Sequence, residues 1–213
     1  MEIKYTVDDL INFEKDIAEC FNNKMIRAPI HLEDGNIPKL IEVFKDVNED
    51  DWVLGTWRSH MKNLLKGVPP DQLKKAILEG KSISLCFKEY RTLSSAIVTG
   101  NIPIGLGLAM DIKRKGQNNR VWVFVGEMTG MSGIFHEAYV YAKNHELPIT
   151  FVVEDNSKSV LTDTRKVWNS NRLYYEPWDV NVGHTGIFKS KHLYYFKYEL
   201  GYPHSGAGTR IQF

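Results

Sequence analysis

Two oxygen-bearing side chains in the second half of the chain are suited to holding a hard cation. Glu127 closely follows the apolar run of residues 121–125, and Asn156 closely follows the apolar run of residues 149–153. Magnesium in proteins takes octahedral oxygen ligands, commonly one or two carboxylate or amide side chains with phosphate oxygens and water. If the two runs are neighbouring strands of one sheet, both side chains reach the same edge, and the pair predicts a magnesium site.

Glycines close to the acid indicate that an anion could share this site. Gly126, Gly130 and Gly133 let the backbone approach a phosphate, and the helix that follows presents its N-terminus to the anion. Neither a Walker lysine loop nor a G-x-G-x-x-G fingerprint is present, which argues against the common nucleotide-binding modes. On the residues alone, a metal–diphosphate site and an ordinary glycine-rich loop both remain open.

The elements that must position these residues form one repeating unit. Residues 121–125 and 149–153 are continuous apolar runs, typical of strands buried on both faces, and residues 134–144 between them are predicted to be helical. Strand, helix and strand at this spacing predict a βαβ unit of a parallel sheet. Ligands of such sheets bind beyond the carboxyl ends of the strands, which here are residues 126–128 and 154–156.

The preceding part of the chain predicts mainly helices. Apolar residues recur at helical spacing over residues 7–21, and Asn36 is predicted to cap a helix opened by Pro38. Residues 82–95 have no clear period and are predicted to wrap the surface.

Two glycines lie inside the helix predicted after Thr99. Glycine in a helix costs about 1 kcal/mol relative to alanine. Gly105 and Gly107 therefore predict close packing by another element.

The tail from Tyr174 to Phe213 is rich in aromatic residues, with lysines between some of them. Such a pattern could bind single-stranded nucleic acid. An edge hairpin or a subunit contact is the favoured interpretation, because aromatic residues are enriched in interfaces.

Composition limits the class of protein. The 213 residues are 43% hydrophobic and 25% charged, which are ordinary values for one globular domain. Lys and Arg number 27 against 26 Asp and Glu, so no whole-chain field attracts nucleic acid or an anionic membrane. Cys20 and Cys86 are too few for a disulfide framework, and no run resembles a signal peptide or a membrane span. We expect a cytoplasmic protein with neither a nucleic-acid nor a membrane partner.

The segment from Gly126 to Asn156 resembles the thiamine diphosphate motif, in which G-D-G precedes an asparagine at the end of the next strand. Further segments agree in order with one family: R-A-P-I-H-L from Arg27, W-R-S-H from Trp57, G-V-P-P from Gly67, I-V-T-G-N-I-P from Ile97, F-H-E-A from Phe135 and L-P-I-T-F-V from Leu147. Over residues 27–164 the chain resembles a short, divergent alpha subunit of the thiamine diphosphate-dependent decarboxylating component of 2-oxoacid dehydrogenases.

That resemblance implies a fold. It is the α/β thiamine diphosphate-binding fold, a three-layer sandwich with a mostly parallel central sheet. Residues 1–164 would form the diphosphate-binding-type domain with its N-terminal helical segment. Residues 165–213 would form a short extension packed on the same domain or on a partner.

The resemblance also implies cofactors, magnesium and thiamine diphosphate, and the residues that meet them. The expected metal ligands are Glu127, Asn156 and the backbone carbonyl of Lys158. The residues expected to contact the cofactor are Trp57, Arg58, Ala96, Val98, Met128, Thr129 and Asn156. Two residues are expected to serve catalysis: His60 near the cofactor and Glu137 lining a channel between paired active sites.

The chain departs from the family pattern at several positions. G-D-G stands here as Gly126-Glu127-Met128, a tyrosine is replaced by Trp57, the histidine of S-M-H by Cys86, and the second histidine of H-x-H by Lys62. The family also has a further active-site histidine after the segment matching Thr164, where fewer than 50 residues remain here.

Two functions follow. The first is an alpha-type subunit that takes part in the oxidative decarboxylation of a 2-oxo acid. It would act with a beta-type, pyrimidine-binding subunit in a heterotetramer, or form a homodimer. The alternative is a non-catalytic relative with a decayed cofactor site, acting in assembly or regulation.

Overall fold

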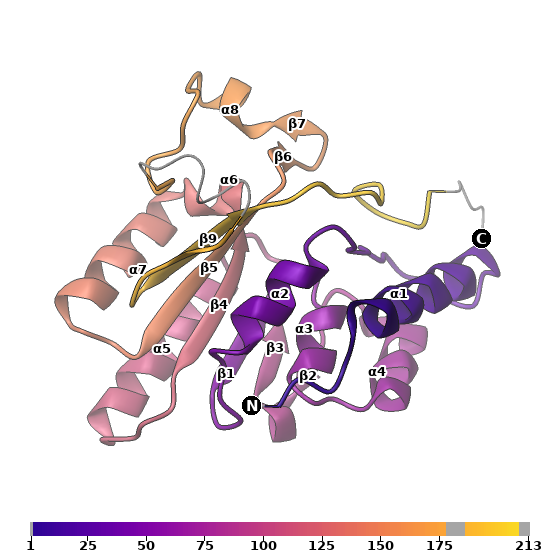
Figure 1. Cartoon of the computed structure of the whole chain (residues 1–213), viewed down its shortest axis with the longest axis horizontal. Helices are drawn as coiled ribbons and strands as arrows, with labels where there is room; N and C mark the ends of the chain where they lie inside the picture. Colours follow the sequence, from indigo (N-terminus) through magenta and orange to yellow (C-terminus); the bar gives the residue numbers. More distant parts are fainter. Residues whose placement is uncertain (1, 178–185, 209–213) are drawn as a thin grey trace.

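A seven-stranded sheet forms the centre of the computed structural model, which describes residues 2–177 and 186–208 (Figure 1). In spatial order its strands are β2 (Cys86–Phe87), β3 (Thr92–Ser94), β1 (Trp52–Gly55), β4 (Val121–Gly126), β5 (Ile149–Asp155), β9 (Leu193–Lys197) and β8 (Phe188–Lys189). The five inner strands run parallel, and each outer strand is antiparallel to its neighbour. The predicted mostly parallel sheet is confirmed.

The predicted βαβ unit is present as β4, α7 (Gly133–Asn144) and β5. Val121 pairs with Ile149 at one end of the two strands and Gly126 pairs with Glu154 at the other. The residues that follow β4 and β5 therefore leave the sheet at the same end of the two strands, as the sequence predicts.

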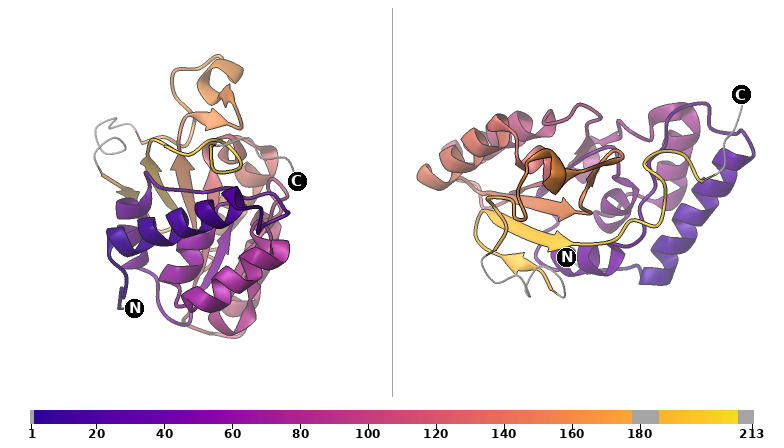
Figure 2. Two further views of the ribbon diagram at one scale, coloured as in Figure 1. Left: turned by 90° about the vertical axis from the view of Figure 1, so that its right-hand side faces the viewer. Right: turned by 90° about the horizontal axis from the view of Figure 1, so that it is seen from above.

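Helices cover both faces of the sheet (Figures 1 and 2). One apolar core contains residues of α1 (Val7–Asn22), α2 (Ile37–Phe44), α3 (His60–Leu65) and α4 (Pro70–Ala76), together with Phe124 and Val152 of the sheet. The other contains residues of α5 (Asn101–Arg114) and α7 with Val123 and Phe151. Alternate strand residues thus enter opposite cores, and the α/β, three-layer prediction is confirmed.

The two glycines of α5 behave differently. A Cβ atom added at Gly105 would lie 2.5 Å from Val123 Cγ2, so the helix packs directly on β4 there. At Gly107 no atom lies within 4 Å of such a Cβ. The prediction of close packing is confirmed for Gly105 and wrong for Gly107, which lies on the outer face of α5.

The prediction that residues 82–95 only wrap the surface is wrong. A π-helical turn η1 (Ile77–Lys81) extends α4, and η2 (Lys88–Tyr90) links β2 to β3. Strand β3 lies between β2 and β1, with Thr92 and Ser94 buried. Three residues are too few to show a strand period in a sequence.

The aromatic tail supplies the other edge of the sheet. Strands β8 and β9 form an antiparallel hairpin, and β9 pairs in parallel with β5, which confirms the edge-hairpin interpretation. Beyond β9 the chain returns across the carboxyl ends of the strands, and Gly206 pairs with His31 (Figure 1). Trp178 and residues 209–213 of this tail lie outside the described residues.

No helix in the two described ranges combines the length and the apolar character needed to cross a membrane.

Candidate functional site

A cavity of about 80 Å³ lies beyond the carboxyl ends of β1, β4 and β5. It brings together predicted site residues from four separate segments: Trp57, Arg58, Val98, Glu127, Met128, Thr129, Asn156 and Lys158. Two further lining residues, Gly126 and Glu154, lie at the strand ends where the sequence predicts a ligand. The remaining lining residues were not predicted from the sequence: Glu33, Thr56, Ser159, Val160, Tyr198 and His204.

Main-chain carbonyls hold Arg58 in place after the end of β1. Its Nε donates to the carbonyl oxygen of Leu32 at 3.2 Å, and its Nη2 donates to that of His204 at 2.8 Å. A guanidinium group has five N–H donors, so donors remain for a ligand in the cavity. Arg58 therefore brings a fixed positive charge to the cavity wall.

Trp57 contributes an unsatisfied donor. Its Nε1 atom is buried and has no hydrogen-bond partner among the described residues. A buried donor left without a partner costs about 1–3 kcal/mol. An acceptor bound within reach of this atom, such as a phosphate oxygen, would remove that cost.

Glu127 begins the short helix α6 (Glu127–Gly130) and is only 2% exposed. Thr164 Oγ1 donates to its Oε1 at 2.5 Å. Burial raises the pKa of the Glu127 carboxyl to about 7; the Thr164 hydrogen bond opposes the shift and the charge of Asp155 adds to it. A cation beside this carboxyl would favour its ionised form.

Asn156 and the backbone carbonyl of Lys158 would supply the other two oxygen ligands expected for the metal. The Lys158 backbone N–H donates to Asn156 Oδ1 at 3.0 Å, and Asn156 Nδ2 donates to the Tyr198 hydroxyl at 3.4 Å. An amide oxygen has two lone pairs, so one remains for a ligand. No cluster of three or more His, Cys, Asp or Glu side chains suited to a metal occurs in the described residues. One carboxylate, one amide oxygen and one carbonyl nevertheless fit magnesium, provided that phosphate and water supply the other ligands.

Three predicted site residues lie outside the cavity lining. His60 is fully buried at the start of α3, where Nδ1 lies 2.8 Å from Glu14 Oε2 and Nε2 lies 2.9 Å from Ser82 Oγ. Both its ring nitrogens are therefore engaged with the helical layer. Glu137 is exposed on α7, and Ala96 is exposed on the loop before α5.

A buried ionic cluster of Lys62, Glu33 and Glu154 lies beside the cavity, which Glu33 and Glu154 also line. Lys62 Nζ lies 3.0 Å from Glu33 Oε2 and 3.1 Å from Glu154 Oε2, and its side chain is 1% exposed. Burial opposes its charge, but the carboxylates of Glu154 and Glu33 raise the pKa of Lys62. The Asn36 amide donates to the same two carboxylates, at 2.8 and 2.9 Å. Asn36 is the N-cap residue of α2, as predicted, but its side chain makes no capping hydrogen bond.

His204 lines the cavity although no sequence motif predicts it as a site residue. Its carbonyl oxygen accepts hydrogen bonds from His31 Nδ1 at 2.6 Å and from Arg58 Nη2 at 2.8 Å. Its ring nitrogens have no hydrogen-bond partner among the described residues. Burial and the charge of Arg58 lower the pKa of His204, so its imidazole is neutral near pH 7. The only signal in the sequence is a histidine in a proline- and glycine-rich turn, which matches no period.

His204 also joins the cavity to a larger neighbour of about 500 Å³. Both are lined by Arg58, Asn156, Lys158, Val160, Tyr198 and His204. The space available to a ligand therefore extends past the imidazole.

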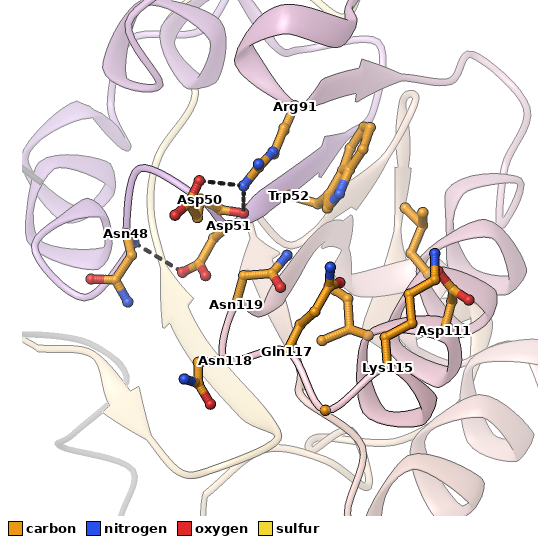
Figure 3. A pocket seen from close by; sticks show the side chains of 13 residues that line it. Asn48, Asp50, Asp51, Trp52, Arg91, Asp111, Lys115, Gln117, Asn118 and Asn119 are labelled. Carbon is orange, nitrogen blue, oxygen red and sulfur yellow. Dashed lines mark hydrogen bonds and ion pairs between the residues drawn. The ribbon is translucent and has the colours of Figure 1, made fainter.

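A larger cavity, about 780 Å³, is lined by residues that precede β1 and β4 and therefore lies at the opposite end of these strands. Figure 3 shows the side chains that line it. Asp50 and Arg91 form an ion pair of 2.6 Å in its wall, and Asp51 accepts the Asn48 backbone N–H at 2.9 Å. It lies by the amino end of β1, and none of the predicted site residues lines it.

The family model described as dehydrogenase E1 component matches residues 5–178. The alpha subunit of acetoin:2,6-dichlorophenolindophenol oxidoreductase from Bacillus subtilis (strain 168) is 26% identical over 159 residues, covering 70% of this chain and 47% of that protein. The alpha subunit of the pyruvate dehydrogenase E1 component from Porphyra purpurea is 26% identical over 166 residues, covering 70% of this chain and 48% of that protein.

A solved structure from Mycobacterium smegmatis, described as a thiamin diphosphate-dependent enzyme, has a TM-score of 0.41 and 18% identity, covering 62% of this chain and 22% of that one. The chain spans about half the length of the curated relatives it matches. Since the family model spans most of the chain, the protein belongs to the dehydrogenase E1 component family.

Proposed function

We propose that this chain is an alpha-type subunit that binds thiamine diphosphate through magnesium and acts on a small 2-oxo acid. The observation that carries the proposal is the cavity at the carboxyl ends of the strands. Four separate segments, each matching a cofactor-contacting motif, line it together. Membership of the dehydrogenase E1 component family supports the same function.

The cavity residues divide into a metal side and an anion side. Glu127, Asn156 and the Lys158 carbonyl would hold magnesium. Arg58, the indole N–H of Trp57 and the backbone of Met128 and Thr129 would contact the diphosphate. The unpartnered Trp57 Nε1 and the unused Arg58 donors support that division.

When bound, thiamine diphosphate supplies a nucleophilic carbon that adds to an oxo group and accepts the electrons released with carbon dioxide. His204 would hold or move a proton at a ring nitrogen, because its imidazole is neutral near pH 7 and unpartnered among the described residues. Arg58 fixes the position of His204 through its carbonyl oxygen. Glu137, exposed on α7, is proposed to face a partner rather than this cavity.

The partner would be a beta-type, pyrimidine-binding subunit, with a heterotetramer as the assembly. Two relatives are named as alpha subunits, which supports a second kind of chain. We place the assembly in the cytoplasm; the two free cysteines, Cys20 and Cys86, are compatible with a reducing compartment.

One observation favours the alternative, a non-catalytic relative acting in assembly or regulation. The cavity measures about 80 Å³, whereas sites for small molecules usually measure roughly 300–1,000 Å³.

Calorimetry distinguishes the cofactor-binding subunit from the non-catalytic relative. Thiamine diphosphate is titrated into the full chain with and without magnesium, alone and with a beta-type subunit. Magnesium-dependent binding that weakens about tenfold in Glu127→Gln supports the cofactor site. No binding in any of these mixtures would favour the non-catalytic relative.

A further inference from the structure

A small hairpin and a short helix follow Asn156 and lie over the carboxyl ends of the strands. They comprise β6 (Lys158–Ser159), β7 (Thr162–Asp163) and α8 (Thr164–Val167) (Figures 1 and 2). Thr164, the first residue of α8, is fully buried, whereas the residues of the two strands before it are exposed or partly exposed. Its hydroxyl group therefore needs a partner inside the fold.

That partner is the carboxylate of Glu127, 37 positions earlier in the chain. Thr164 Oγ1 donates to Glu127 Oε1 at 2.5 Å, and both side chains are almost completely buried, so water competes little for the bond. A hydrogen bond to an ionised carboxylate is about twice as strong as one between neutral groups. No other residue in the described ranges donates to the second oxygen, Oε2, which is therefore available to a ligand.

A separate contact fixes the backbone of Glu127. The Tyr175 hydroxyl donates to the Glu127 carbonyl oxygen. The Tyr175 ring packs against Gly130 at the end of α6, where an added Cβ would lie 2.7 Å from Tyr175 Cε1. With the backbone held, the side-chain torsions of Glu127 decide where its carboxylate points. Glutamate has one more torsion than the aspartate of the motif that this segment resembles, so a further contact is needed to hold one orientation.

Thr164 also contacts the segment that carries the second expected metal ligand. Its backbone N–H donates to the carbonyl oxygen of Ser157, which directly follows Asn156, at 3.1 Å. The next residue, Arg165, donates from Nη1 to Ser157 Oγ at 3.2 Å. Thr164 thus connects Glu127 to the chain beside Asn156, and it fixes where these two residues lie relative to each other.

Magnesium demands nearly ideal octahedral geometry, with ligands at roughly 2.0–2.1 Å. Hydrogen bonds to a ligating carboxylate set its orientation, and their loss commonly weakens metal binding about 10–100-fold. We propose that Thr164 is a positioning residue of the metal site, which holds Glu127 Oε1 and leaves Oε2 to magnesium. This inference rests on the proposed function, because it concerns the same site.

Three variants of the full chain test the hydroxyl group. Thr164→Val keeps the shape of the side chain and removes the donor, whereas Thr164→Ser keeps the donor. Thr162→Val is the control, because Thr162 is exposed on the same hairpin and lies outside the cavity lining. Circular dichroism confirms that each variant is folded, and Thr164→Ala replaces Thr164→Val if the latter does not fold.

The probe is Mn²⁺ in the presence of inorganic pyrophosphate, with the bound metal measured by electron paramagnetic resonance. Manganese prefers the same octahedral oxygen ligands as magnesium. We expect Thr164→Val to bind Mn²⁺ about tenfold or more weakly than the parent protein. Thr164→Ser and Thr162→Val should bind it like the parent protein.

A second background separates positioning from a merely structural role. In Glu127→Ala, the further substitution Thr164→Val should cause no additional loss of Mn²⁺ affinity, because the hydroxyl acts through the Glu127 carboxylate. An equal loss in both backgrounds, unchanged affinity in Thr164→Val, or no Mn²⁺ binding by any of the proteins would overturn the positioning role of Thr164.

Titration of magnesium thiamine diphosphate distinguishes this inference from the proposed function. If thiamine diphosphate binds none of the proteins while Mn²⁺ affinity follows the Thr164 hydroxyl, the proposed function fails and the positioning role stands. If the parent protein and Thr164→Val bind thiamine diphosphate equally well, the proposed function stands and the positioning role fails.

Discussion

Lys62 is enclosed between the Glu33 and Glu154 carboxylates, at 3.0 and 3.1 Å from its Nζ atom. Replacing it with methionine keeps the volume and leaves two buried carboxylates without their cation. We expect Lys62→Met to lose about 3–5 kcal/mol of unfolding free energy in urea denaturation. The exposed Lys115→Met is the control, and a similarly small loss in both variants would contradict the structural role of Lys62.

His31 provides a pH test beside the cavity. Burial lowers the pKa of His31 to about 4, although its hydrogen bond to the His204 carbonyl opposes the shift. The unfolded chain, with a pKa of about 6.5, takes up the proton first as pH falls. Stability is therefore complete above that value and is lost between about pH 6.5 and 4, by on the order of 3 kcal/mol.

His31→Asn keeps a donor for the His204 carbonyl but cannot titrate. Urea denaturation of both proteins at pH 7.5 and pH 5 measures the difference. We expect the parent protein to lose more stability on acidification than the variant. Parallel losses would show that His31 does not carry the pH dependence.

Much of the candidate site could be predicted from single residues, and the remainder depends on contacts between distant segments. Glu127 and Asn156 follow strands, so their convergence could be read from the sequence. His204 comes from a turn that returns to the site after β9, and no local pattern predicts that path. Asn36 has the residue type of a helix cap, yet its amide bonds to buried carboxylates brought by other elements.

At the scale of elements, the two glycines of helix α5, Gly105 and Gly107, allow a matched pair of test substitutions. An alanine Cβ at position 105 would lie 2.5 Å from Val123 Cγ2, whereas at position 107 it meets nothing within 4 Å. We expect Gly105→Ala to lower the unfolding free energy by about 1–3 kcal/mol through overpacking. Gly107→Ala should raise it by about 0.5–1 kcal/mol by restricting the unfolded chain.

Chemical denaturation of the two variants and the parent protein measures both effects. Opposite signs support the packing of α5 on β4. Equal effects on stability would contradict it.

The strands illustrate why some elements could be predicted and others could not. Strands β4 and β5 are long, apolar and buried on both faces, so their composition alone predicts them. Strand β3 has three residues and forms through pairing with β1, which no local pattern encodes. The position of residues 156–168 likewise depends on the contacts of Arg165 with Asp155 and of Thr164 with Glu127.

At the scale of the whole molecule, the residues proposed to bind the cofactor gather at one end of the sheet. The carboxyl ends of the strands carry the candidate site, and a cavity of about 780 Å³ lies at the other end without any predicted site residue. The chain spans about half the length of the curated relatives it matches. The sequence predicts the sheet and the carboxyl ends of the strands that carry the candidate site, while the C-terminal return of the chain adds His204 to that site.

The most direct test of the cofactor site is the dissociation constant of magnesium thiamine diphosphate for the parent protein, Arg58→Ala and Arg114→Ala, each with the beta-type subunit. Arg58 lines the cavity, whereas Arg114 lies on the exposed end of α5 paired with Asp111. We predict binding by the parent protein and by Arg114→Ala, and affinity about tenfold or more lower in Arg58→Ala, because a charge-assisted hydrogen bond contributes about 1.5–3 kcal/mol. Equal affinity in all three proteins, or no binding by any of them, would contradict the account.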